Sequence, residues 1–115
     1  MTKDCIFCRI VDGQATAKIV FEDETVVAFE DLNPQAPVHL LVVPRRHLPS
    51  LEEAAAEDEP LLGHLFMVAA RLARERGLET KGHRTVINIG PGAGQSVFHL
   101  HVHVLGGRVF RWPPG

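Results

Sequence analysis

The chain has no tyrosine, one tryptophan and two cysteines among its 115 residues. It also lacks any apolar run near the ~20 residues that a membrane-spanning helix needs, so we expect no membrane association. The first residues, Met1 to Cys5, lack the apolar segment of a secretory signal, and we expect a cytoplasmic protein. The net charge of −2 gives no electrostatic case for a nucleic-acid or membrane partner.

Apolar residues make up 45% of the chain, which is typical of one globular domain over residues 1–115. A helical apolar stripe predicts one long helix from Pro60 to about Arg76, with Gly77 ending it. Short helices are predicted at residues 5–12 and after Ser50. Alternating or β-branched runs predict five strands, at 18–22, 25–30, 38–43, 84–89 and 98–105. This order favours an α+β domain built on a five-stranded antiparallel sheet.

Histidine alternates strictly with apolar residues from position 98 to position 105. Successive side chains of a strand point to opposite faces, so one face is predicted to carry three imidazoles about 6.6 Å apart. These are His99, His101 and His103. The other face is predicted to enter the core with Phe98, Leu100, Val102 and Val104.

The histidine row is open to three interpretations. It can be a solvated or hydrogen-bonded polar face without function, a metal-dependent hydrolase site or a site of nucleophilic catalysis. On a straight strand, His99 and His103 lie about 13 Å apart, so one zinc ion with bonds of ~2.1 Å cannot bind both. A neutral imidazole attacks phosphorus well near pH 7, which favours nucleophilic catalysis.

A glycine-rich loop leads directly into the histidine row, from Gly90 to Ser96. Glycines let main-chain N–H groups approach an anion closely, and the side chains of Gln95 and Ser96 add donors. The loop is not a P-loop, because no Gly-Lys-Ser/Thr follows. It therefore indicates phosphate binding only together with the histidines that follow it.

Residues 95–105 resemble the signature of the histidine triad (HIT) family, in which three histidines alternate with apolar residues. The likeness extends to Asp31 through His39 and to the ending Trp112-Pro113-Pro114-Gly115, so it covers nearly the whole chain. It points to the nucleotide-binding branch of the family, the purine nucleoside phosphoramidases. The resemblance implies hydrolysis of adenosine 5′-monophosphoramidate-type substrates to a nucleoside monophosphate, of the AMP or GMP type, and an amine. Catalysis would need no cofactor. Alternatives are a dinucleoside polyphosphate hydrolase with the same nucleophile and a non-catalytic nucleotide-binding regulator.

The resemblance also implies residue roles. His101 would attack phosphorus and form a covalent nucleotidyl-histidine, with His99 positioning it, partly through the main-chain carbonyl. His103 would contact the phosphate, His39 would orient the cluster, and Ser96 would contact the leaving group. The implied nucleotide contacts are Phe7, Phe29 and Leu32 for the base, Asp31 for the ribose hydroxyls, and Asn88, Gly94, Gln95 and Ser96 for the phosphate.

Cys5 and Cys8 have the spacing of half a zinc site. The resemblance completes that site with His47 and His99, as a structural centre. The alternative is a pair of buried thiols that pack as small apolar groups.

The family likeness also implies a homodimer in which the two sheets join into one and the long helices pack together. The C-terminal segment with Trp112 would then reach the partner's site. A dimer of this kind would cover an exposed sheet edge.

Overall fold

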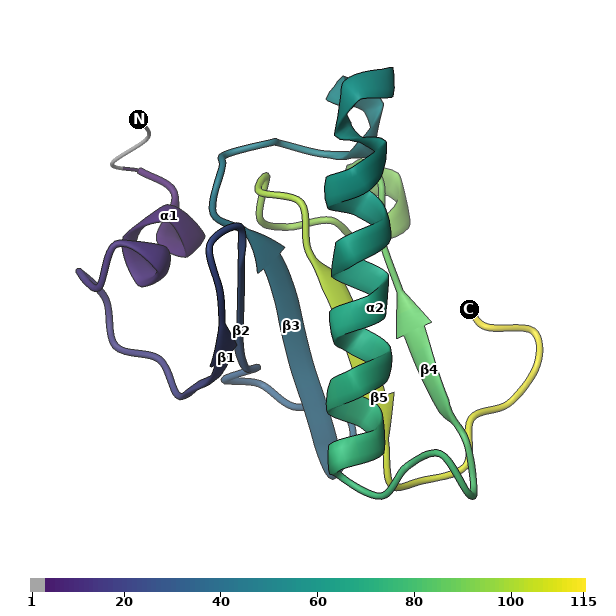
Figure 1. Ribbon diagram of the computed structural model, residues 1–115. Coiled ribbons are helices and arrows are strands. Elements are labelled where there is room, and N and C mark those ends of the chain that lie inside the picture. The colour runs from purple at the N-terminus through teal and green to yellow at the C-terminus, as the bar shows by residue number, and fades with distance from the viewer. Residues whose placement is uncertain (1–3) are drawn as a thin grey trace.

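The structure is a computed structural model that describes residues 4–115, so most of the stretch examined for a secretory signal lies outside it. In chain order the elements are α1 (Ile6–Val11), β1 (Ile19–Glu22), β2 (Val26–Glu30), β3 (Val38–Pro44), α2 (Glu59–Glu75), β4 (His83–Val86) and β5 (Val102–Gly106). Figure 1 shows α1 and α2 packed around one sheet. Single 3-10 turns at Leu51–Glu53, Ala56–Asp58 and Pro91–Ala93 lie in the connections.

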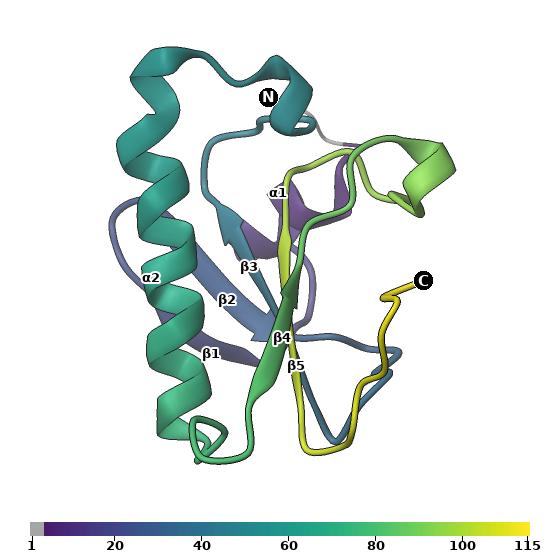
Figure 2. The same cartoon turned by 90° about the vertical axis from the view of Figure 1, so that its right-hand side faces the viewer.

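The five strands form one antiparallel sheet in the order β1-β2-β3-β5-β4, which confirms the predicted fold class. Helix α2 covers one face of the sheet and α1 lies against the other (Figures 1 and 2). The central pair, β3 and β5, is joined with Leu41 opposite His103. This pairing brings the predicted histidine row beside the strand that carries His39.

The sheet has a core on each face because the side chains of its strands alternate. Leu40 and Val42 of β3 pack with Leu65 and Leu72 of α2. The core on the α1 side is formed by Phe7, Ile10, Val27, Phe29, Leu41 and Val43. The histidines also lie on the α1 face of the sheet, so the site is next to this packed apolar core.

Helix α2 confirms the predicted long helix to within one residue at each end. Its C-terminus closes at Gly77, whose φ of 71° is the left-handed conformation that glycine adopts without strain. The Leu78 N–H donates to the Ala73 carbonyl and the Gly77 N–H to the Arg74 carbonyl, both at 2.9 Å. These two bonds form a Schellman motif and satisfy carbonyls that the helix end would leave unpaired.

The predicted strand over 98–105 is wrong for its first four residues, because β5 begins at Val102. The Leu100 N–H donates instead to the Leu48 carbonyl at 2.7 Å, beyond the end of β3. Phe98 is 48% exposed, so its predicted place in the core is also wrong, whereas Leu100, Val102 and Val104 are buried.

The strand predicted at 84–89 ends early, at Val86, which pairs with His103. Since β5 offers only one more residue beyond His103, residues 87–89 have almost no ladder to join. None of the helices in residues 4–115 has the length and apolarity needed to cross a bilayer.

Candidate active site

Four histidines gather on the α1 side of the sheet. His103 comes from β5, His39 from β3, and His99 and His101 from the extended segment that precedes β5. The ring centroids of His101 and His103 are 5.0 Å apart, and those of His39 and His103 are 5.1 Å apart. His99 is fully buried and His101 is 7% exposed, so these two histidines do not form a solvated face.

His101 is held so that its outer nitrogen is the reactive one. Its Nδ1 lies 2.8 Å from the His99 carbonyl, which can only accept, so Nδ1 carries the proton. The lone pair of the neutral ring is therefore on Nε2. Phe7 packs edge-on against the imidazole, with ring centroids 5.1 Å apart. Burial lowers the pKa of His101 below its usual value, which keeps the ring neutral at pH 7.

A chain of hydrogen bonds sets the protonation of the other two imidazoles. The Gln35 N–H donates to His39 Nδ1 at 3.0 Å, so the proton of a neutral His39 is on Nε2. His39 Nε2 lies 2.8 Å from His103 Nδ1 and donates to it. Burial, together with the nearby imidazoles, lowers the pKa of His103 to about 4. His103 is therefore neutral at pH 7 with its own proton on Nε2.

A cleft of about 510 Å³ opens beside these histidines, a size typical of small-molecule sites. Phe7 and Phe29 form its buried apolar wall, with their rings edge to face and centroids 5.3 Å apart. Leu32 lies at the rim and is 88% exposed. Asp31 also lines the cleft, and its carboxylate accepts the Asn33 N–H at 2.8 Å and lies 3.3 Å from His39 Nε2.

The glycine-rich loop forms the opposite side of the cleft through Gly94 and Ser96. Asn88 lies beside Gly94, because a Cβ at Gly94 would be 3.8 Å from Asn88 Nδ2. Gln95 does not fit its expected place at the phosphate. Its Nε2 donates to the Pro49 and Val97 carbonyls, and its Oε1 accepts the Gly90 N–H. Gln95 is 3% exposed and shapes the loop from within.

A second cluster joins α1 to the start of the histidine row. The ligand atoms of Cys5, Cys8, His47 and His99 all lie within 4.8 Å of one another. The closest pairs, Cys5 Sγ–His99 Nδ1 at 3.3 Å, Cys8 Sγ–His47 Nδ1 at 3.3 Å and the two Nδ1 atoms at 3.2 Å, approach the ~3.4–3.6 Å expected between ligands of a tetrahedral zinc. His99 Nε2 donates to the Pro44 carbonyl at 2.8 Å, which leaves Nδ1 unprotonated toward the thiols. The donor set therefore fits zinc.

The group of Asp31, His39 and His103 fits a metal less well, although its atoms also lie within 4.8 Å of one another. The 2.8 Å between His39 Nε2 and His103 Nδ1 is a hydrogen bond, shorter than the ~3.4 Å between two nitrogens on a tetrahedral zinc. We interpret this group as a hydrogen-bonded relay.

Comparison with known proteins agrees with this arrangement. The sequence model of the family described as "Scavenger mRNA decapping enzyme C-term binding" matches residues 4–109. Over 115 residues the chain is 51% identical to an uncharacterized HIT-like protein of Synechococcus elongatus, with 100% of both chains covered. The chain belongs to the histidine triad family.

Solved structures of histidine triad proteins superpose closely on this one. A HIT family hydrolase from Legionella pneumophila has a TM-score of 0.95 at 44% identity, covering 97% of this chain and 100% of that one. A histidine triad protein from Clostridium difficile has a TM-score of 0.93 at 40% identity, covering 96% of each chain. The fold is therefore that of the histidine triad hydrolases.

In this histidine triad protein the sequence pattern identified the imidazoles but missed two of the main-chain groups that set their protonation. These are the Pro44 carbonyl and the Gln35 N–H, whereas the His99 carbonyl was expected from the family resemblance. Any residue type carries such groups, so composition and spacing give no signal for them. Ile6 and Ile10 also line the cleft and were expected only as part of a helical turn.

Proposed function

We propose that this protein hydrolyses purine nucleoside phosphoramidates through a covalent nucleotidyl-histidine on His101. The observation that carries the proposal is the lone pair of a neutral, buried His101 at a cleft with an apolar wall and a glycine loop. The hydrolase named among the solved relatives supports the general class of reaction.

In the proposed first step, His101 Nε2 attacks phosphorus, the P–N bond breaks, and the amine leaves with a proton taken from solvent. The imidazole becomes cationic, and the His99 carbonyl at Nδ1 stabilises that charge. His103, with its proton on Nε2, can donate to a phosphoryl oxygen. Water then attacks phosphorus and returns a proton to solvent, the bond to Nε2 breaks, and nucleoside monophosphate leaves with the lone pair returned to His101.

The contacts proposed for the nucleotide follow from the cleft. The base would lie against Phe7 and Phe29, with Leu32 covering it from the rim. The Asp31 carboxylate would accept the two ribose hydroxyls. Ser96 and the Gly94 main chain would contact the phosphoryl group and the leaving amine, with Asn88 beside them.

A single-turnover experiment tests the reaction. Excess protein is mixed with adenosine 5′-phosphoramidate labelled at phosphorus, and acid-labile label on the protein is measured after a rapid quench. We expect label on the wild type and on His83→Ala, an exposed histidine of β4. His101→Ala should give no label and no turnover, yet bind AMP within about tenfold, ~1.4 kcal/mol, of the wild type. Retained turnover in His101→Ala contradicts the mechanism, and binding without label in the wild type indicates a regulator.

We also propose that Cys5, Cys8, His47 and His99 hold a structural zinc. Bound there, zinc would supply a closed cross-link and no open position for substrate. The proposed ligands connect α1, which carries Phe7 of the base wall, to the residue whose carbonyl orients His101. Thiol ligands persist in a reducing compartment, so this proposal agrees with the cytoplasmic location expected from the sequence.

We further propose a homodimer. The outer edge of β4 has no strand neighbour within the described chain. The outer face of α2 carries an apolar stripe at helical spacing, formed by Gly63, Phe66, Met67 and Ala70, in which Phe66 is 42% and Met67 66% exposed. A second copy that pairs through β4 and packs this stripe would cover both features.

A further inference from the structure

The loop between β2 and β3, residues 31–37, supports the active site although much of it is exposed. Besides the Gln35 N–H bonded to His39, Gln35 Nε2 donates to the Asn33 carbonyl at 3.0 Å. The Asn33 N–H in turn donates to Asp31. Asn33, Pro34 and Gln35 are all exposed, so few packing contacts hold this end of the loop. The orientation of the Gln35 peptides therefore depends on support from elsewhere.

The C-terminal segment after β5 supplies that support at two points. Arg108 Nε donates to the Gln35 carbonyl at 2.9 Å. At Gly107, with a φ of +91°, a Cβ would lie 2.9 Å from the Cβ of Pro37, so only glycine permits this close approach. Figure 2 shows the tail in yellow and the loop in blue side by side at the lower right.

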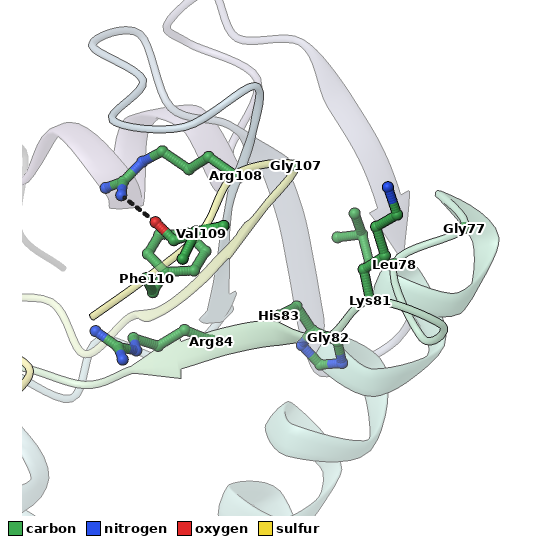
Figure 3. A pocket seen from close by; sticks show the side chains of 10 residues that line it. All are labelled: Gly77, Leu78, Lys81, Gly82, His83, Arg84, Gly107, Arg108, Val109 and Phe110. Atoms are coloured by element: carbon green, nitrogen blue, oxygen red, sulfur yellow. Dashed lines mark hydrogen bonds between the residues drawn. The ribbon is translucent and has the colours of Figure 1, made fainter. Parts of the chain in front are cut away.

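The Arg108 side chain is itself held in place. Its guanidinium carbon lies 4.3 Å from the centre of the Phe110 ring, and Nη1 donates to the Val109 carbonyl at 3.1 Å. Arg84 of β4 lies 5.3 Å from the same ring centre and donates to the Arg111 carbonyl. Figure 3 shows the two guanidinium groups on either side of Phe110. Such cation–π contacts restrict the side chains that make them.

These residues line a hollow of about 710 Å³ together with Lys81 and His83. Its basic character could suggest an anion site. However, both arginines direct donors to main-chain carbonyls of the tail or of the loop. The arrangement holds two chain segments together, which accounts for the arginines without a ligand.

We propose that Arg108 is a positioning residue for the active site, acting through Gln35 on His39. The carbonyl and the N–H of Gln35 belong to two adjacent rigid peptides that are separated only by φ and ψ of Gln35, so anchoring the carbonyl limits the positions that the N–H can take. That N–H keeps the proton of His39 on Nε2, where it is donated to His103. The catalytic consequence rests on the proposed function, whereas the link from Arg108 to His39 does not.

Loss of the Gln35 donor has a specific consequence for the imidazoles. A neutral His39 would then be free to carry its proton on Nδ1, which puts a lone pair on Nε2. Two lone pairs would face each other across the 2.8 Å between His39 Nε2 and His103 Nδ1. His103 would have to change its tautomer or move, and its Nε2 proton would no longer be available to the phosphoryl group.

The test compares Arg108→Met with Arg84→Met in the full-length protein. Both substitutions remove a guanidinium that stacks on Phe110 and bonds the tail, but only Arg108 contacts the loop. Nitrogen-15 NMR of the imidazoles reports the His39 tautomer without substrate, and hydrogen exchange reports the Gln35 amide. Arg108→Met should give a second His39 tautomer and exchange at Gln35 faster by about tenfold, the size expected for one lost hydrogen bond. Arg84→Met should change both readouts much less, because Arg84 supports Phe110 and the tail but donates nothing to the loop.

The kinetic part of the test uses the phosphoramidate assay. In Arg108→Met we expect kcat to fall about tenfold with AMP affinity changed less than about threefold. Arg108→Lys, which keeps a donor, should stay near the wild type. An unchanged His39 tautomer and Gln35 exchange in Arg108→Met overturn the proposal, as does an equal effect of Arg84→Met. If the NMR changes appear but no variant, wild type included, turns over phosphoramidate, the link stands and the proposed function fails.

Discussion

Three of the four imidazoles at the centre of this molecule, those of His39, His99 and His101, have one nitrogen bonded to a main-chain group, and that bond decides what the other nitrogen can do. The Nε2–H of His99 donates to the Pro44 carbonyl, so the lone pair is on Nδ1, where it could bind a metal. The Nδ1–H of His101 donates to the His99 carbonyl, so the lone pair is on Nε2, where it could act as a nucleophile. Two histidines therefore differ in chemistry because a different ring nitrogen of each donates to a main-chain carbonyl.

Asp31 offers a test at the same scale. Its carboxylate is expected to accept the ribose hydroxyls, an interaction of substrate binding that changes little on the way to the transition state. Asp31→Ala should therefore raise KM about tenfold or more, the loss of a hydrogen bond to a charged group, and change kcat less than about threefold. Steady-state kinetics with the phosphoramidate measure both.

Two controls separate ribose binding from support of the loop. Asp31→Asn keeps an oxygen that can accept the Asn33 N–H and removes only the charge. A substrate without the 2′- and 3′-hydroxyls should show the raised KM with the wild type and no further rise with Asp31→Ala. A fall in kcat at unchanged KM would contradict the ribose role.

At the scale of elements, α1 is connected to the sheet by the cluster of Cys5, Cys8, His47 and His99, whose members come from α1 and from the segments that follow β3 and precede β5. Only six residues long, it lacks the length to be stable by itself. Its N-cap residue Cys5 and its own Cys8 lie close to His47, beyond β3, and His99, before β5. A metal at this point would hold α1, and with it Phe7, against the sheet.

Removal of metal is therefore expected to loosen the structure. Elemental analysis of untagged protein should find about one zinc per chain, and Cys8→Ser should lower Tm by roughly 10 °C, about 2–3 kcal/mol. Wild type stripped by a chelator should unfold at the same temperature as Cys8→Ser, because both lack the same cross-link. Less than about 0.1 zinc per chain, or an unchanged Tm in Cys8→Ser, would remove the proposed centre.

The elements also show what a sequence can and cannot predict. The ends of α2 were predictable because Pro60 and Gly77 act locally, through backbone conformation. The start of β5 was not, since alternation continues through Phe98 whether or not a neighbouring strand is present. Where a ladder ends depends on how the two strands run together: β3 pairs with β5 only as far as Val42 and Val102, although β3 itself continues to Pro44 as the partner of β2. Alternation correctly predicted that Leu100, Val102 and Val104 face the core, because it is a local property. It could not predict where the strand begins, because that depends on the neighbouring strand.

The candidate site divides in the same way. The four histidines were found because their types and spacing are rare in sequence. The inward turn of Gln95 and the exposure of Leu32 were not, because both depend on how loops fold over the sheet. The bond from the Arg108 side chain to the Gln35 carbonyl was also hidden, since it joins residues 73 positions apart and ends on a main-chain atom.

At the scale of the whole molecule, the outer edge of β4 and the exposed apolar stripe of α2 lie next to each other. The free edge of β4 presents main-chain donors and acceptors, and an exposed strand edge of this kind is a template for pairing. The α2 stripe lies on the helix that covers the sheet next to that edge (Figure 1). In the proposed homodimer, the two surfaces together would offer a second copy both hydrogen bonds and apolar contact.

Met67 is the position at which to test the dimer, because it is the most exposed large apolar residue of the stripe at 66%. A glutamate buried there would meet its own copy or an apolar surface, which is costly without a partner charge. We expect Met67→Glu to raise the dimer dissociation constant at least about a hundredfold, ~2.7 kcal/mol, as measured by sedimentation velocity. Ile19→Glu is the matched control, since Ile19 is 40% exposed on β1, at the opposite edge of the sheet. A wild type that is monomeric at tens of micromolar, or an equal effect of both substitutions, would contradict this interface. If Met67→Glu becomes monomeric with unchanged Tm, the dimer forms through α2 from chains that fold independently.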